Sequence, residues 1–127
     1  MRLIRNPEGG REVIATDIEF ADSLVTQGRG LMFRRSIPDD YALVFRFGEL
    51  GTVGSLLAGG SGVRNRGLHM LFVPFDIDAV WLVDGEVREV QRLRAWRGHG
   101  SARADTVVEL PAGAADSVEV GDQLVLG

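Results

Sequence analysis

The sequence predicts a single mainly β domain, a compact antiparallel β-barrel or sandwich with one helix near the N-terminus. Three observations lead to this prediction. The chain has 127 residues, which suits one domain with one core, so we expect a single domain over residues 1–127. It holds 17 glycines but only 4 prolines, scattered without a period, as is typical of tight turns. About eight short apolar runs alternate with these turn residues, which indicates short strands.

The N-terminal elements are predicted to be a hairpin followed by the helix. The apolar residues 3–4 and 13–15 flank a dense Asn, Pro and Gly turn sequence, the pattern of a β-hairpin. Thr16 stands three residues before Glu19, which is the spacing of a capping box, and apolar residues then recur on one helical face. Gly28 is expected to end this helix, since glycine adopts the left-handed conformation that closes helices.

The remaining apolar runs have strand length and are rich in β-branched or aromatic residues. They cover residues 41–47, 68–73, 77–83, 87–93, 106–110 and 123–126. Asp84-Gly85 predicts a two-residue hairpin turn between two of them. The segment from Gly48 to Gly67 holds seven glycines and is expected to be a long loop that is either mobile or functional.

The composition argues against several kinds of function. The net charge is −4, from 18 acidic and 14 basic residues, so we expect neither nucleic acid nor membrane as a partner. All 14 basic residues are arginine, which excludes Schiff-base chemistry on lysine. The absence of cysteine removes disulfides and thiolate metal ligands. No apolar run reaches the length of a signal peptide or membrane helix, so we expect a cytoplasmic location.

Two signature segments occur on either side of a central apolar segment. In order, these are Gly30-Leu31-Met32 with Arg34, then residues 70–78, then Glu109-Leu110-Pro111-Ala112-Gly113 with Gly121-Asp122. Together they resemble the family called domain of unknown function 192, or UPF0127, over residues 12–126. The resemblance implies a compact β-barrel-like domain with one helix near the N-terminus. It implies no biochemical role.

The chain departs from this family at two positions, and other residues that match the family are expected to have structural roles. Family members commonly carry an aromatic residue before the central methionine and a proline two residues before the aspartate, where this chain has His69 and Asp76. Residues 31–33 are expected to seat the end of the helix on the core. The segments at 111–113 and 118–122 are expected to be chain reversals.

We interpret residues 30–34, residues 70–78 and the loop around Trp96 as the frame of a shallow ligand-binding pocket. Arg34 would recognise an anionic or polar group, Asp78 would orient it, and Trp96 would supply an apolar face, with Met70 as a further contact. The function expected from this interpretation is that of a non-catalytic accessory module, monomeric or homodimeric. It would bind a small ligand or a protein partner without a cofactor.

A purely structural role is the main alternative for the acidic residues. Asp78 lies between apolar neighbours, so burial would require a partner such as Arg34 or backbone amides that fix a loop. Glu109 also lies between apolar neighbours, so its burial would likewise require a partner. Arginines surround Trp96, and this cluster could stack on a sugar or base, anchor a partner, or line a solvated strand edge.

Two further functions remain open. A metal-dependent hydrolase or lyase would use His69 or His99, the only histidines, with Asp76 or Asp78. No HxH or HxxxH spacing supports it, so a non-catalytic role is preferred. A structural homodimer or interaction protein that uses exposed strand edges is the other alternative.

Overall fold

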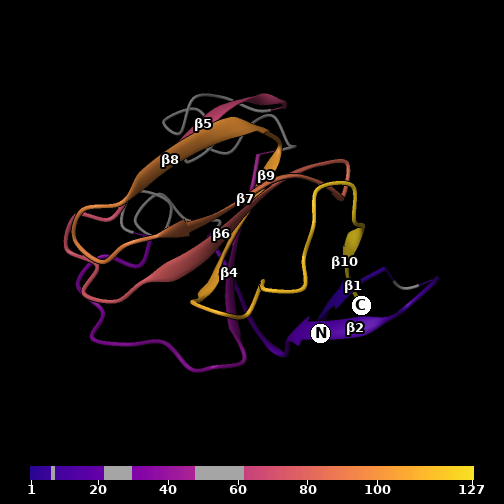
Figure 1. The fold of residues 1–127 in the computed structure, drawn as a ribbon, viewed down its shortest axis with the longest axis horizontal. Helices are drawn as coiled ribbons and strands as arrows, with labels where there is room; N and C mark the ends of the chain where they lie inside the picture. The colour runs from indigo at the N-terminus through magenta and orange to yellow at the C-terminus, as the bar shows by residue number, and fades with distance from the viewer. Residues whose placement is uncertain (7, 22–29, 48–61) are drawn as a thin grey trace.

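The computed structural model describes residues 1–6, 8–21, 30–47 and 62–127, which form ten β-strands and no helix (Figure 1). In chain order the strands are β1 (Leu3–Arg5), β2 (Glu12–Ala15), β3 (Asp17–Phe20), β4 (Tyr41–Arg46), β5 (Arg64–His69), β6 (Ile77–Val83), β7 (Glu86–Leu93), β8 (His99–Ala104), β9 (Thr106–Pro111) and β10 (Leu124–Leu126). The prediction of a mainly β fold is therefore confirmed.

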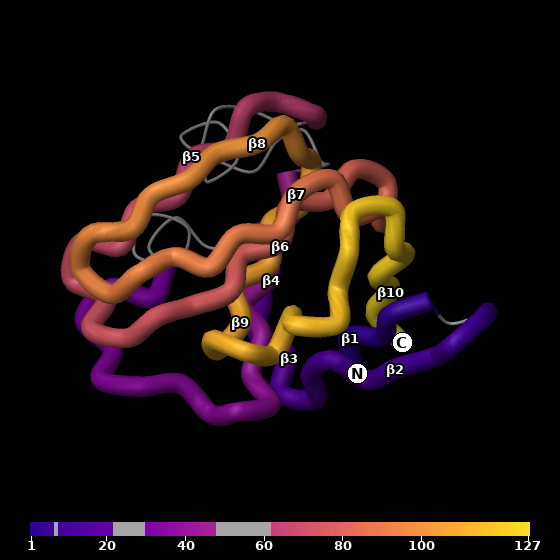
Figure 2. The backbone as a smooth tube through the Cα atoms, in the orientation of Figure 1, coloured from indigo at the N-terminus to yellow at the C-terminus, as the bar shows by residue number. Residues whose placement is uncertain are grey.

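The described strands form three separate sheets. A five-stranded sheet in the order β3-β4-β9-β6-β7 is central, a three-stranded sheet β10-β1-β2 joins the two ends of the chain, and β5 pairs with β8. All pairs are antiparallel except β3 and β4, which run parallel. Figure 2 shows β5 and β8 lying across one side of the central sheet and both termini at the opposite corner. These sheets do not close into the predicted barrel.

The central sheet buries an apolar cluster on each face, because successive side chains of a strand point to opposite sides. On β6, Ala79 and Trp81 belong to the first cluster, whereas Val80 and Leu82 belong to the second. The indole Nε1 of Trp81, which is fully buried, donates to the carbonyl of Arg66 at 2.8 Å and ties β5 to the central sheet. In the described part of the chain, no helix is long and apolar enough to cross a membrane.

The predicted N-terminal helix is wrong over its first half, where residues 17–20 form β3. The amides of Thr16 and Asp17 both donate to the carbonyl of Asp40, at 2.9 Å, and β3 continues beside β4. Ile18 and Phe20 pack on the second cluster, so a period of two fits this segment. The pairing offered by a distant strand outweighs the local capping pattern. The remainder of the predicted helix, residues 22–29, lies outside the described residues.

Two other expectations need correction. The strand predicted at residues 68–73 is wrong beyond His69, because β5 ends there and residues 70–73 form a loop. The long loop predicted for residues 48–67 ends within β5, and its portion 48–61 lies outside the described residues. By contrast, the turn at Asp84-Gly85 is confirmed, with φ angles of 49° and 78° as a type I′ turn requires.

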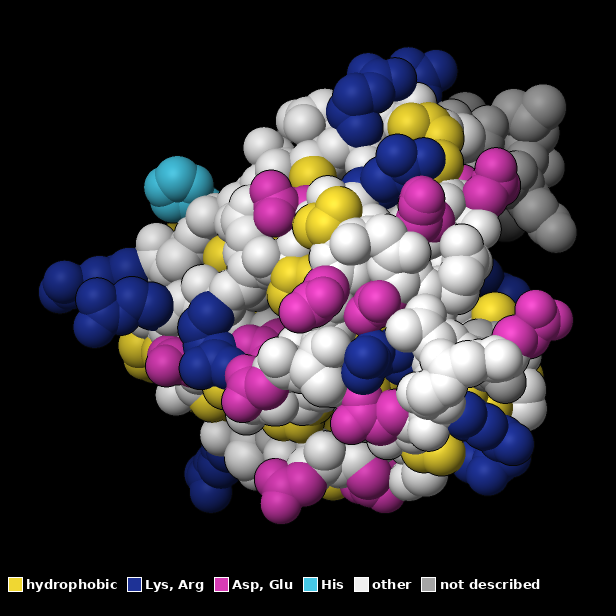
Figure 3. Space-filling model, turned by 45° about the vertical axis from the view of Figure 1, so that its right-hand side comes forward, with side chains coloured by type: hydrophobic (Ala, Val, Ile, Leu, Met, Phe, Trp, Pro, Cys, Tyr) yellow, Lys and Arg dark blue, Asp and Glu magenta, His cyan; other side chains and the backbone are white. Residues whose placement is uncertain are grey.

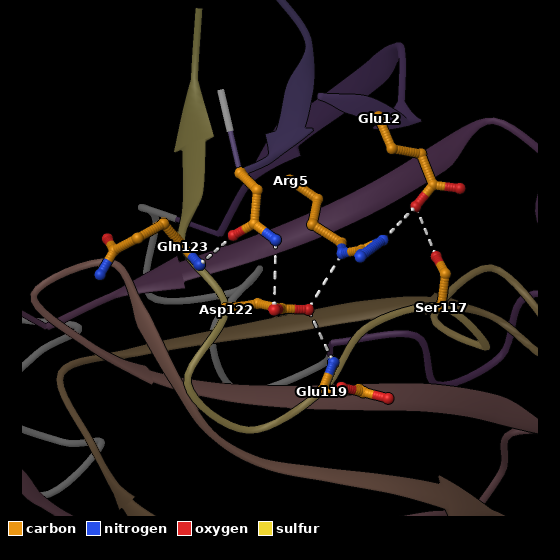
Figure 4. Close-up of polar contacts among 7 residues, drawn as sticks. Arg5, Glu12, Ser117, Glu119, Asp122 and Gln123 are labelled. Carbon is orange, nitrogen blue, oxygen red and sulfur yellow. Dashed lines mark hydrogen bonds and ion pairs between the residues drawn. The ribbon is translucent and has the colours of Figure 1, made fainter. Parts of the chain in front are cut away.

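The two chain reversals expected near the C-terminus, at 111–113 and 118–122, are present in the structure. Gly113 and Gly121 both have a φ of 98°, a conformation that favours glycine. After the second reversal, Asp122 accepts hydrogen bonds from Arg5 Nε at 2.9 Å, from the Asn6 side chain at 3.2 Å and from the Glu119 amide at 2.9 Å (Figure 4). This network joins β1 to the last turn of the chain.

Replacing Asp122 by alanine is expected to lower the free energy of unfolding by about 2 kcal/mol, because it leaves several donors unsatisfied. The hydrogen bond from the Glu119 amide, with help from Asn6 and Arg5, lowers the pKa of Asp122 below its usual 3.8. The contribution of Asp122 to the free energy of unfolding is therefore present above pH 3.8 and is lost as the pH falls below that value. Urea denaturation at pH 7 and pH 3 measures both effects. Glu119→Ala, which removes an exposed side chain, is the control, and an equally small loss for both variants would contradict the prediction.

Candidate functional site

Three loops meet at one end of the central sheet, on the left in Figure 1: residues 30–37, 70–76 and 94–98. The amide of Phe33 donates to the carbonyl of Phe72 at 2.8 Å, and the amide of Trp96 donates to the carbonyl of Val73 at 3.0 Å. The rings of Phe33 and Phe72 stack with centroids 5.0 Å apart. The structure therefore brings together the three segments that the sequence interpretation had grouped.

These loops expose four large apolar side chains, which we call the loop surface. Their exposed fractions are 60% for Phe33, 58% for Leu71, 49% for Phe72 and 54% for Trp96. Exposed apolar clusters on soluble domains mark interaction sites more often than isolated exposed side chains do. Phe33 was expected in the core, so that expectation is wrong. An aromatic residue in an apolar run gives no local signal that it points outward.

The backbone of the loop surface is held in an unfavourable conformation. Phe33, Phe72 and Trp96 have φ angles of 67°, 61° and 67°, in the left-handed region. The other non-glycine residues with positive φ in the described chain are an asparagine and an aspartate, which tolerate it. Each bulky residue costs about 1 kcal/mol or more in this region, and such strain concentrates at functional sites.

The three loops are basic although the chain as a whole is acidic. They carry four arginines and only one acidic residue, Asp76, against a net charge of −4 for the protein. Arg35, Arg94 and Arg97 are exposed, and none of them forms an ion pair within the described part of the chain. In Figure 3, arginine side chains project beside a histidine at the left edge, whereas the rest of that face mixes both charges.

Arg34, the fourth arginine of the loops, is already engaged. Its guanidinium donates to Glu19 at 2.8 Å and to the Tyr41 hydroxyl at 3.0 Å, and the hydroxyl also donates to Glu19. The Tyr41 hydrogen bond and then the Arg34 hydrogen bond lower the pKa of Glu19, whereas burial raises the pKa of Tyr41. Arg34 therefore anchors its loop to β3 and β4.

Glu109 is a buried carboxyl beneath the first of these loops. It lies on β9 between Leu43 of β4 and Ala79 of β6, is 5% exposed, and faces the first apolar cluster. A Cβ atom added to Gly30 would lie 3.5 Å from its Oε1. No hydrogen-bond donor reaches it from the described residues, and burial raises its pKa to about 7, against a lowering by Arg34. The two signature segments thus meet at this carboxyl.

Asp78 lies on the opposite face of the sheet from Glu109, so the structure does not bring it together with Arg34. It is opposite Leu110, a member of the second cluster. Its carboxylate accepts from the amides of Gly113 and Ala115 at 2.9 and 3.0 Å, and from Arg92 Nε at 2.5 Å. This is the structural role considered for Asp78, in which backbone amides fix a loop.

Met70 is 1% exposed and belongs to the first apolar cluster. Its amide donates to the carbonyl of Gly98 at 3.0 Å, so its position fixes one loop against another. Gly98 itself has no room for a side chain, because a Cβ atom there would lie 2.5 Å from the amide nitrogen of Arg94. Met70 thus supports the loop surface from beneath, and Trp96 forms part of it.

The two histidines are direct neighbours, since His69 on β5 pairs with His99 on β8. The amide of Leu71 donates to His69 Nδ1 at 3.2 Å, and the carboxylate of Asp76 accepts from the Ala95 amide at 2.8 Å. Among the residues that the structure describes, no group of three or more metal-ligating side chains is assembled. The geometry thus gives no support to the metal-enzyme alternative.

Fold and site together define a small mainly β domain with a basic aromatic loop surface and a buried carboxyl. The model of the DUF192 family, described as "Uncharacterized ACR", matches residues 4–126. The chain belongs to this family. It is 33% identical over 123 residues to the UPF0127 protein PF1050 of Pyrococcus furiosus, with 94% of this chain and 93% of the relative covered.

Two solved structures share the fold. One is a protein of Sinorhizobium meliloti named "putative transcription regulator", with a TM-score of 0.73, 23% identity, and 98% of this chain and 92% of that chain covered. The other is a protein of unknown function from Novosphingobium aromaticivorans, with a TM-score of 0.72, 19% identity, and coverages of 99% and 84%. At these identities the likeness concerns the fold alone.

Proposed function

We propose that this protein is a non-catalytic binding module that docks a partner protein through the loop surface. The observation that carries the proposal is the exposed cluster of Phe33, Leu71, Phe72 and Trp96, built on three loops that hydrogen bonds hold together. For a domain on its own, three aromatic residues that are both exposed and in a strained backbone conformation are unfavourable. Contact with a partner would offset this cost.

The exposed fractions favour a protein partner over a small ligand. Pockets for small molecules enclose most of the ligand surface, whereas these side chains project about half of their own surface into solvent. Covering what remains exposed would contribute about 1 kcal/mol for each side chain. Aromatic residues and arginine, both of which are present among the exposed side chains of the three loops, are also the types enriched at the centres of protein interfaces.

The three loops and the rings of Phe33 and Phe72 contact one another in the protein without a partner. Phe33 and Phe72 stack on each other, their loops share a backbone hydrogen bond, and Gly98 permits the tight turn that follows Trp96. A surface that is already ordered loses little conformational entropy on binding. The loop surface is therefore suited to a specific partner contact.

Site-specific photo-crosslinking tests this function. With p-benzoylphenylalanine in place of Trp96, we expect a discrete protein adduct in a lysate of the native host. The same residue in place of Val120, which is 64% exposed outside the three loops, should not give this adduct. Phe33→Asn and Phe72→Asn should abolish it while preserving the fold, because asparagine tolerates a positive φ.

Identical adducts from the two crosslinker positions would argue against the proposal. So would an adduct from position 96 that persists undiminished in the Phe33→Asn, Phe72→Asn variant. Circular dichroism and thermal melting of each variant separate loss of the contact from loss of the fold.

A further inference from the structure

We infer that the segment docking on the loop surface is an acidic stretch of protein with apolar side chains among its carboxylates. This inference rests on the proposed docking function and adds the chemistry of the partner. Arg35, Arg94 and Arg97 carry it, together with the aromatic residues that they flank.

The arginines stand next to the apolar anchors along the chain. Arg35 follows Phe33 by two residues, while Arg94 and Arg97 bracket Trp96. A guanidinium accepts a carboxylate in a two-pronged geometry, and its plane also packs against aromatic rings. A segment in which acidic and apolar residues alternate at short spacing satisfies both kinds of group at once.

The charge of the protein points in the same direction. These arginines have no described acidic partner, although acidic residues outnumber basic ones in the chain by 18 to 14. The three loops therefore form a local basic area on an acidic protein. Complementary charge speeds encounter with an acidic segment and disfavours a basic one.

The same charges disfavour two other occupants. A second copy docked by two-fold symmetry would place arginines against arginines, which is repulsive at the short distances of an interface. A nucleic-acid strand carries a charge at every nucleotide, whereas the protein surface away from the three loops mixes both charges (Figure 3) and the chain as a whole is acidic. A short acidic peptide segment avoids both costs.

Fluorescence anisotropy with short labelled peptides tests the inference on the intact protein. One peptide alternates Asp or Glu with Phe and Leu, the second has Lys in place of the acids, and the third keeps the acids but has Ser in place of the apolar residues. We expect the first to bind with micromolar to millimolar affinity, weakened by salt, and the others to bind at least about tenfold more weakly.

Charge reversal provides the matched comparison. The double variant Arg94→Glu, Arg97→Glu should reverse the preference toward the lysine peptide, and Trp96→Asn should weaken the acidic peptide while thermal melting stays unchanged. Arg88→Glu is the control, because Arg88 is an exposed arginine on β7, outside the three loops. It should leave the affinities within about twofold of the parent protein.

Failure of the inference is distinct from failure of the proposed function. Equal binding of acidic and basic peptides, no binding of the acidic peptide at millimolar concentration, or an unchanged preference in the double variant would overturn the acidic partner. So would stronger binding to phosphatidylglycerol vesicles or to a single-stranded oligonucleotide than to the peptide. The crosslink from position 96, if retained with these results, would keep the docking function and assign it a different partner.

Discussion

Replacing Glu109 by glutamine is expected to remove a loss of stability that the parent protein undergoes between about pH 4.5 and pH 7. Above pH 7 the variant should be more stable than the parent by about 3 kcal/mol. Glutamine has nearly the same shape as a protonated glutamate but cannot ionise. The two proteins should therefore have similar stabilities at pH 4 and diverge as the pH rises.

The sign of this effect follows from the burial of Glu109. Burial raises the pKa of the folded-state carboxyl to about 7, whereas its ordinary value is 4.5. Between these values the unfolded chain releases the proton and the folded chain keeps it, so the free energy of unfolding falls. The part of the free energy of unfolding that depends on protonated Glu109 is therefore fully present below pH 4.5 and is lost above pH 7.

Urea denaturation of both proteins from pH 4 to pH 8 measures the effect. Glu119→Gln, at an exposed position, is the control and should follow the parent protein at every pH. Stability curves for the parent and Glu109→Gln that run parallel across this range would contradict the prediction. Such a result would mean that Glu109 is ionised in the folded protein and has a partner.

Replacing Asp78 by alanine is expected to destabilise the protein by about 3 kcal/mol. The carboxylate is almost fully buried and satisfies the amides of Gly113 and Ala115, which would lose their acceptor. Arg92 is half exposed and regains water when its partner is removed, so little further cost comes from it. The turn after β9 should loosen, because Asp78 is the group that holds it to β6.

Asp116 is the matched control for Asp78, because it pairs with the same guanidinium at 2.9 Å but is 76% exposed. Asp116→Ala should cost less than about 1 kcal/mol. Hydrogen exchange of the Gly113 and Ala115 amides gives a local readout, and protection there should fall only in Asp78→Ala. Equal losses in the two variants would show that the buried bonds add nothing to stability.

Elements of the fold were predictable from the sequence where neighbouring residues determine them, and were not where residues distant in the chain do. The turn at Asp84-Gly85 was predictable because its two residues carry the required backbone freedom themselves. Residues 17–20 were misassigned because their helix signals are local, whereas the acceptor at Asp40 and the neighbouring β4 come from far along the chain. A polar strand such as β8 gave no apolar pattern and was missed.

For the candidate site, too, some features were predictable from the sequence and others were not. A buried carboxylate at position 78 was foreseeable from its apolar neighbours, and so was its bonding to backbone amides. Its separation from Arg34 was not, because it depends on the register that places Ala79 opposite Glu109 and Asp78 opposite Leu110. A shift of one residue in that pairing would exchange the two faces.

The sequence alone determined the mainly β class, the family and the exclusion of lysine and cysteine chemistry, since these depend only on residue types and their order. Tertiary structure alone decided that Phe33 and Phe72 stack in solvent, and that Glu109 is buried without a described donor. Exposure is a property of what packs against a residue. For both features the packing partners come from loops and strands distant in the chain, so no local pattern records them.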